Sequence, residues 1–204
     1  MSVTKNNEKM ITSLQQLDFT KTYTYADYLT WQFDDSVELL KGKIYRMAAP
    51  SRRHQMVTGN LYATIRHFLW KKPCHVFIAP FDVRLTIQDK NSNQEITTVV
   101  QPDVCLVCDA AKLDDAGCIG APNLIIETLS PGNTKKEMKN KYNIYEEAGV
   151  QEYWVVYPTD KTVQRFVLNE QGKYIGLAPL TDEDVLTTTI LPGLEIRLED
   201  IFED

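Results

Sequence analysis

Residues 123–129 read NLIIETL, and this stretch decides how the fold is interpreted. A short, almost continuous apolar run of this length is typical of a buried β-strand. Its single charged residue, Glu127, follows Leu124, Ile125 and Ile126 directly. A carboxylate at the end of a buried strand costs several kcal/mol if it has no partner. The stretch therefore predicts a strand whose one acidic side chain is held by a cation.

A helix is predicted directly after this strand, over residues 134–148. Thr134 and Glu137 have the T-x-x-E spacing of a capping box at its start. Gly149 is the residue expected just beyond a helix end. Apolar segments follow the helix, and they predict strands over residues 150–157, 162–168, 174–177 and 194–198, with a turn at 158–161.

Upstream, residues 51–70 are predicted to form the longest helix. Ser51 is a plausible N-cap, and apolar residues recur every four positions from Val57 to Leu69, which gives a broad apolar stripe. The other upstream elements are a short helix after Thr24 and strands over 36–40, 43–47, 75–79, 82–87 and 99–107. Pro102 cannot donate a ladder hydrogen bond, so we expect an edge or a bulge there. Polar residues 88–95 and residues 109–122 are predicted loops.

Most of the predicted strands lie in the middle of the chain, and helices lie beside them. This order favours an α/β fold with a mixed central sheet flanked by helices and with added β-hairpins. No linker divides the chain, so residues 23–204 are expected to form a single domain. Residues 1–22 are polar, lack the apolar core of a signal peptide and are expected to be a flexible lead-in.

The composition indicates an ordinary globular protein, with 204 residues of which 43% are hydrophobic. No apolar run approaches the roughly 20 residues of a membrane helix, so we expect no membrane contact and a cytoplasmic location. In that reducing compartment the four cysteines should be free thiols. Cys105 and Cys108 form a C-x-x-C spacing, but positions three apart on a strand face opposite sides, which disfavours one shared metal.

Three residues between positions 101 and 145 form the candidate site. Asp103 follows Pro102 at the start of a strand, Glu127 lies in the apolar strand, and Lys141 lies in the next helix. Two carboxylates on adjacent strands could share Mg²⁺, which prefers oxygen ligands and keeps several waters. Such a metal polarises a phosphodiester and activates water, and a nearby lysine stabilises negative charge.

Each of these residues also has a plain structural explanation. Asp103 after a proline is a common turn residue. Glu127 could form a buried salt bridge, for example to Lys141 itself. Lys141 could instead pair with Glu137 on the helix surface, for which about 0.2–0.5 kcal/mol is typical. Spacing alone therefore indicates a candidate metal site and leaves these alternatives open.

Several motifs in this order resemble one known family. Pro102-Asp103 and E-x-L-S-P at residues 127–131 look like the active-site motifs of the PD-(D/E)XK nuclease superfamily, and specifically of its Uma-two branch. The other matching motifs are ELLKGKIY at 38–45, MAAP at 47–50 followed by His54, K-x-x-x-Y at 141–145 and AGVQEYW at 148–154. The resemblance implies a restriction-endonuclease-like fold, Mg²⁺ (with Mn²⁺ as a substitute) and hydrolysis of phosphodiester bonds in DNA.

Carried over residue by residue, the resemblance makes Asp103 and Glu127 the metal ligands. Leu129 stands where the superfamily has lysine, and in this branch the lysine is placed in the following helix, which makes Lys141 the candidate. Glu38 matches a supplementary acidic residue, and His54 is a candidate assisting residue. Glu137 stands where this branch commonly has aspartate, so its role is open.

The net charge of −6 is unlike the basic footprint of a non-specific DNA binder. Metal ions can offset the carboxylates of a nuclease site, and Lys135 and Lys136 lie where a helix N-terminus favours phosphate contact. We therefore expect a DNA endonuclease. The alternatives are a non-catalytic nucleic-acid-binding or scaffold protein on the same fold, and a hydrolase of small phosphate esters. The resemblance also implies a homodimer, for which Tyr153, Trp154, Val156 and Phe166 are candidate contacts unless they belong to the core.

Overall fold

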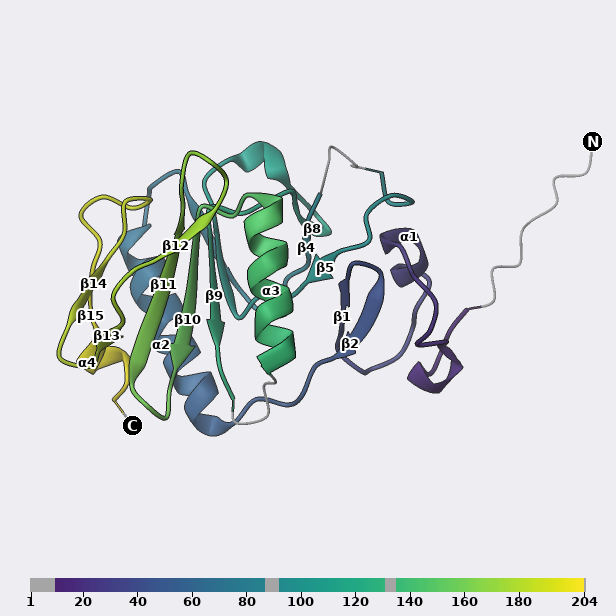
Figure 1. The fold of residues 1–204 in the computed structure, drawn as a ribbon, viewed down its shortest axis with the longest axis horizontal. Coiled ribbons are helices and arrows are strands. Elements are labelled where there is room, and N and C mark those ends of the chain that lie inside the picture. The colour runs from purple at the N-terminus through teal and green to yellow at the C-terminus, as the bar shows by residue number, and fades with distance from the viewer. Residues whose placement is uncertain (1–9, 87–91, 131–134, 204) are drawn as a thin grey trace, which may run out of the picture.

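In a computed structural model, which describes residues 10–86, 92–130 and 135–203, two sheets lie side by side (Figure 1). The main sheet has the strand order β12-β11-β10-β9-β6-β3, with β13 also paired to β11. Its strands are β3 (His75–Ile78), β6 (Val104–Val107), β9 (Leu124–Thr128), β10 (Glu152–Tyr157), β11 (Thr162–Leu168), β12 (Tyr174–Gly176) and β13 (Leu180–Thr181). The pair β9–β10 is parallel and the others are antiparallel, so the sheet is mixed as predicted.

A second sheet has the order β2-β1-β5-β4-β8-β7. Its strands are β1 (Val37–Leu40), β2 (Lys43–Arg46), β4 (Val83–Arg84), β5 (Val99–Val100), β7 (Leu113–Asp114) and β8 (Gly117–Ile119). A separate hairpin near the C-terminus consists of β14 (Val185–Thr187) and β15 (Glu195–Arg197). The turn between β1 and β2 has positive φ at Lys41 and Gly42, as two-residue hairpins favour.

Two long helices cover opposite faces of the main sheet (Figure 1). Helix α2 (Arg52–Phe68) begins at the predicted cap Ser51, and α3 (Lys135–Ala148) ends before Gly149, whose φ is +83°. The shorter helices are α1 (Tyr25–Tyr28), α4 (Leu198–Ile201) and the 3-10 turns η1 (Leu14–Gln16) and η2 (Ala110–Lys112). Thr134, half of the predicted capping box, lies outside the described residues, as do residues 88–91 of the predicted loop.

The core follows the alternation of side chains along the strands. Ile126 and Val104 pack with α2, whereas their neighbours Ile125 and Cys105 pack with α3. Because successive side chains on a strand point to opposite faces, the main sheet separates two apolar layers. Glu127, two residues after Ile125, accordingly contacts residues of α3.

The segment around Pro102 differs from its prediction. Residues 99–107 were expected to form one strand with an edge or bulge, but β5 belongs to the second sheet and β6 to the main sheet. Residues 101–103 are the passage between the two sheets, so no ladder hydrogen bond is required of Pro102. Asp103 therefore lies where the two sheets meet.

Three other sequence predictions require correction, and part of the expected lead-in has defined contacts. Residues 109–122 contain η2 and the β7–β8 hairpin, whose strands are too short to show a pattern. Of the strand predicted over 82–87, whose last residue lies outside the described ones, only Val83–Arg84 forms a strand, β4. Thr20 and Lys21, at the end of the expected lead-in, contact the domain, since Lys43 Nζ donates to both of their carbonyls. Three predicted dimer contacts are core side chains instead: Tyr153, Trp154 and Val156 are at most 2% exposed.

The cysteines also differ from expectation. Cys74 and Cys108 form a disulfide, while Cys105 and Cys118 are free and buried. The expected opposite orientation of Cys105 and Cys108 is observed, because Cys105 packs in the α3 layer and Cys108 against the α2 layer. The disulfide joins the segment before β3 to the end of β6, which the sequence did not indicate.

Candidate active site

Glu127 lies at the centre of a buried network on the α3 side of the main sheet. Its Oε1 accepts hydrogen bonds from Lys141 Nζ at 3.0 Å and from the Tyr145 hydroxyl at 2.5 Å. Strand β9 places the carboxylate, and α3 places both donors on one face, because residues four apart in a helix are neighbours. The predicted carboxylate in an apolar strand therefore has the cationic partner that its burial requires.

Lys141 joins this network to the second sheet. Its Nζ lies 3.1 Å from Oε1 of Glu38 in β1, and the same oxygen accepts the backbone N–H of Gln101 at 2.9 Å. The Lys141 and Glu127 side chains are each only 9% exposed, and that of Glu38 is 2% exposed. Lys141 thus pairs with two buried carboxylates, and the surface pair with Glu137 is not needed to explain it.

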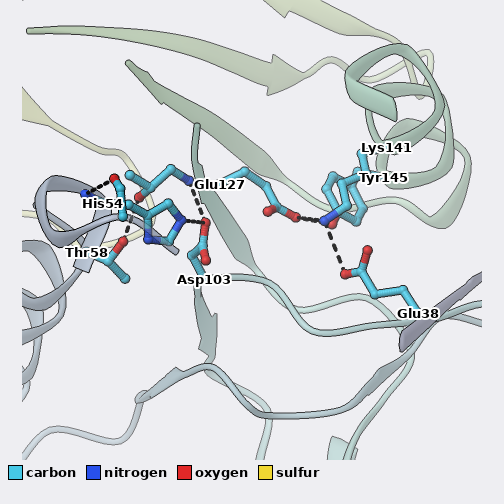
Figure 2. Close-up of polar contacts among 9 residues, drawn as sticks. Glu38, His54, Thr58, Asp103, Glu127, Lys141 and Tyr145 are labelled. Carbon is cyan, nitrogen blue, oxygen red and sulfur yellow. Dashed lines mark hydrogen bonds and ion pairs between the residues drawn. The ribbon is translucent and has the colours of Figure 1, made fainter. Parts of the chain in front are cut away.

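Asp103 forms a second network toward α2. Its Oδ2 lies 3.2 Å from Nε2 of His54 and accepts the backbone N–H of Thr128 at 2.7 Å. His54 is in the first turn of α2, where its own backbone N–H donates to the cap residue Ser51. Figure 2 shows the Asp103 carboxylate directed to His54, while the Glu127 carboxylate is directed to Lys141. The two predicted metal ligands therefore belong to adjacent networks.

The β6–β9 register explains why these networks are adjacent. Val104 pairs with Ile126 across the antiparallel strands. One further step along that register brings Asp103 opposite Glu127. The structure thus brings all five predicted catalytic residues, Glu38, His54, Asp103, Glu127 and Lys141, to the region where β1, β6, β9, α2 and α3 meet.

The electrostatics of the site show an excess of negative charge. Burial is the main cause that raises the pKa of Glu127, and the nearby Asp103 and Glu38 carboxylates act in the same direction. Lys141 opposes them, and the net result is a pKa of about 7. Burial would lower the pKa of Lys141, but Glu127 and Glu38 outweigh it and hold that pKa well above its ordinary value. Burial likewise opposes protonation of His54, yet its bond to Asp103 leaves its pKa raised.

These residues fit a divalent cation that is held largely by water. Within the described residues, no three His, Cys, Asp or Glu side chains form a ready-made metal cage. The hydrogen bonds described above use Oδ2 of Asp103 and Oε1 of Glu127, so Oδ1 and Oε2 are the oxygens that would bind a cation. One or two carboxylates completed by waters are the usual Mg²⁺ environment in proteins.

Three contributors to the site were not assigned a role from the sequence. Tyr145 bonds Glu127, Thr128 donates its backbone N–H to Asp103, and the Thr58 hydroxyl donates to that of Thr128 at 2.9 Å. The role of Tyr145 had a signal in the sequence, because Lys141 and Tyr145 are four residues apart in a predicted helix and so share one face. Thr58 and Thr128 meet across α2 and β9, far apart in sequence, and no local pattern marks them.

The two lysines predicted to lie at the start of the helix after β9 are found there. Lys135 and Lys136 lie exposed in the first turn of α3, as expected.

A mixed sheet with a helix on each face, with a carboxylate pair and a lysine where two neighbouring strands meet, agrees with the restriction-endonuclease-like architecture expected from the sequence. The chain belongs to the Uma2 family, whose model, described as "Putative restriction endonuclease", matches residues 25–199. None of the curated proteins matches the chain.

A solved structure supports the same fold. It is described as "a putative nuclease belonging to DUF820 from Anabaena variabilis", and it is 15% identical to this chain with a TM-score of 0.69. The match covers 88% of this chain and 97% of that one. At this identity the likeness shows the fold, and it agrees with the α/β architecture expected from the sequence.

Proposed function

We propose that this protein is a Mg²⁺-dependent endonuclease that hydrolyses phosphodiester bonds in DNA. The observation that carries the proposal is the ion pair between Lys141 and Glu127, at 3.0 Å, beside Asp103. Leu129 occupies the position where the superfamily has lysine, and in this proposal Lys141 supplies the cation from α3 instead. The displaced lysine was one reason for the scaffold alternative, and the ion pair of Lys141 with Glu127 supports the catalytic one.

Each residue has a distinct role in the proposed reaction. Asp103 and Glu127 would hold the metal, which when bound polarises the phosphodiester and lowers the pKa of attacking water. Lys141 stabilises negative charge that develops on the phosphate oxygens. Glu38 holds Lys141 from the opposite side, and Tyr145 fixes the rotamer of Glu127. His54 and the Thr128 N–H orient Asp103.

The proposal extends to the DNA and to the assembly. The exposed Lys135 and Lys136, at the start of α3, would contact phosphates beside the site.

We also keep the homodimer as a proposal. Its contact surface is not formed by Tyr153, Trp154 and Val156, because these side chains lie in the core. A single monomeric mass by light scattering at micromolar concentration would contradict the dimer. None of the described helices is long and apolar enough to cross a membrane.

Cleavage of plasmid and single-stranded DNA tests the proposed activity. We expect cleavage with Mg²⁺ or Mn²⁺, none with EDTA, and a loss of at least about 100-fold in Asp103→Asn or Glu127→Gln, because each removes one metal-binding charge. Asp109→Asn, a change in an exposed η2 cap, is the matched control. Cleavage that persists unchanged in Asp103→Asn would show that the assignment of this site is wrong.

Calorimetric titration of Mg²⁺ separates the catalytic proposal from the scaffold alternative. Metal binding that disappears in Glu127→Gln and persists in Asp109→Asn supports a metal site at these carboxylates. Absence of Mg²⁺ and Mn²⁺ binding to the wild-type protein, together with absence of cleavage, would instead favour a non-catalytic role. A phosphodiesterase screen with small esters tests the remaining alternative.

A further inference from the structure

Residues 51–81 differ in charge from the rest of this acidic protein. They contain five Arg or Lys residues and no Asp or Glu, in a chain with net charge −6. The segment comprises α2, β3 and the turn between them. Arg66, Lys71 and Lys72 are all exposed at the C-terminal end of α2. Within the described residues, no carboxylate forms an ion pair with any of these three cations.

Aromatic side chains are interleaved with these cations. Trp70 is 64% exposed, and the guanidinium carbon of Arg66 lies 5.4 Å from its ring centroid. Nζ of Lys72 lies 3.1 Å from the centroid of Phe68. Trp70, Arg66, Lys71 and Lys72 line a hollow of about 460 Å³, whose walls include Tyr62 and Phe77 and contain no acidic residue.

This combination matches one chemical class of ligand. An exposed indole offers a face on which a nucleobase can stack, and stacking of this kind is worth about 1–3 kcal/mol per base. Exposed lysines and arginines such as Arg66, Lys71 and Lys72 attract phosphates, and the counterions of the nucleic acid are released. A duplex covers most base faces with neighbouring bases, whereas a single strand leaves them open. We propose that the hollow beside Trp70 is a binding site for single-stranded nucleic acid.

The site is separate from the candidate active site. His54 is near the start of α2 and Trp70 lies just past its end, so a rise of 1.5 Å per residue separates them by about 24 Å. The inference rests on the proposed function and deepens it: a single-stranded part of the substrate would bind beside Trp70, away from the bond that is cleaved. Binding measured in EDTA nevertheless succeeds or fails independently of cleavage.

Fluorescence anisotropy with the full chain tests the proposal. The probe is a fluorescein-labelled oligothymidylate of about 15 nucleotides, in EDTA and at low salt. Wild-type protein should bind it. If three cations contact phosphates, the logarithm of the binding constant should fall with the logarithm of the salt concentration with a slope of about −2. Trp70→Ala should bind about 5- to 100-fold more weakly, and Lys71→Gln should reduce the slope by about 0.7. Phe19→Ala, another exposed aromatic, and Lys161→Gln, an exposed lysine, should bind as wild type.

Intrinsic fluorescence gives a second readout. Of the three tryptophans, Trp154 is fully buried, Trp31 is half-buried and Trp70 is 64% exposed. Quenching by the oligonucleotide should therefore come mainly from Trp70 and be largely lost in Trp70→Phe, while part of the binding remains and Trp31→Phe keeps the quenching. Circular dichroism checks that each variant is folded. Unchanged affinity and quenching in Trp70→Ala would overturn the proposal. An equal loss of affinity in Phe19→Ala would also overturn it. A blunt duplex that binds as tightly as the single strand, and that depends equally on Trp70, would overturn it as well.

Discussion

Lys141 and Glu127 form a buried ion pair between helix α3 and strand β9, with Nζ 3.0 Å from Oε1 and each side chain 9% exposed. The pair joins β9, which contains most of the NLIIETL stretch, to α3, the next helix in the sequence. Because Lys141 also reaches Glu38 in β1, one side chain connects the main sheet, the second sheet and α3. Such a pair need not stabilise the fold relative to apolar residues, but loss of one partner is costly.

Removal of the lysine charge should destabilise the protein strongly. In Lys141→Met, Glu127 and Glu38 are left buried without their cation, which costs about 3–5 kcal/mol in comparable sites. Urea unfolding measures the change, with Lys139→Met, an exposed lysine of the same helix, as the control. The double variant Lys141→Met with Glu127→Gln should recover part of the loss, because the two residues are coupled. Additive losses would argue against a direct pair.

The Tyr145 hydroxyl should contribute to stability through its bond to Glu127. Tyr145→Phe removes a 2.5 Å hydrogen bond to a carboxylate and keeps the ring that packs edge-on against Tyr153. We expect a loss of about 1.5–3 kcal/mol, as for hydrogen bonds to charged groups. The free energy of unfolding is measured beside Tyr142→Phe, a half-buried tyrosine of the same helix. Equal effects of the two substitutions would contradict a special role for Tyr145.

Glu146 should make stability depend on acid pH. Its carboxylate accepts the Tyr174 backbone N–H at 2.7 Å and the Lys173 ammonium at 2.9 Å, and these bonds hold the pKa of Glu146 below its ordinary value of 4.5. The ionised Glu146 carboxylate therefore stabilises the folded state above pH 4.5, and this stabilisation is lost as the pH falls through the lowered pKa of the folded state.

Denaturation of Glu146→Gln across a pH series measures this contribution. The variant should be less stable than wild type at pH 7 by no more than about 1 kcal/mol, because the group is near the surface. The difference should shrink as the pH falls below 4.5. Glu170→Gln, at an exposed position, serves as the control. A difference that stays constant down to the lowest pH would show that the carboxylate charge is not its source.

The Cys74–Cys108 disulfide should be detectable and stabilising. Under denaturing, non-reducing conditions, thiol titration should find only Cys105 and Cys118. The disulfide spans a sequence separation of 34, and closing a loop of that size contributes about 2–4 kcal/mol. Cys74→Ser should lower the unfolding free energy by that amount and make it insensitive to dithiothreitol. Four reactive thiols in unreduced protein would instead restore the expectation drawn from the sequence.

Local patterns predicted many of the elements around the site. The four-residue apolar period and Ser51 predicted α2, the apolar run predicted β9, and Gly149 marked the end of α3. These features depend on propensities and capping within a few residues, so a single chain displays them. The short strands β7 and β8 were missed because two or three residues are too few to show a period.

By itself, the sequence determined that Glu127 needs a cation, because a charge in an apolar strand has few other sources of compensation. It also determined that Lys141 and Tyr145 share one face of α3. Only the tertiary structure decided which partner each residue has: that Lys141 reaches Glu38 as well, that Asp103 turns toward His54, and that residues 99–107 divide between two sheets. Those contacts join residues about 50 to 100 positions apart, and packing of the complete chain, rather than any local preference, brings them within hydrogen-bonding distance.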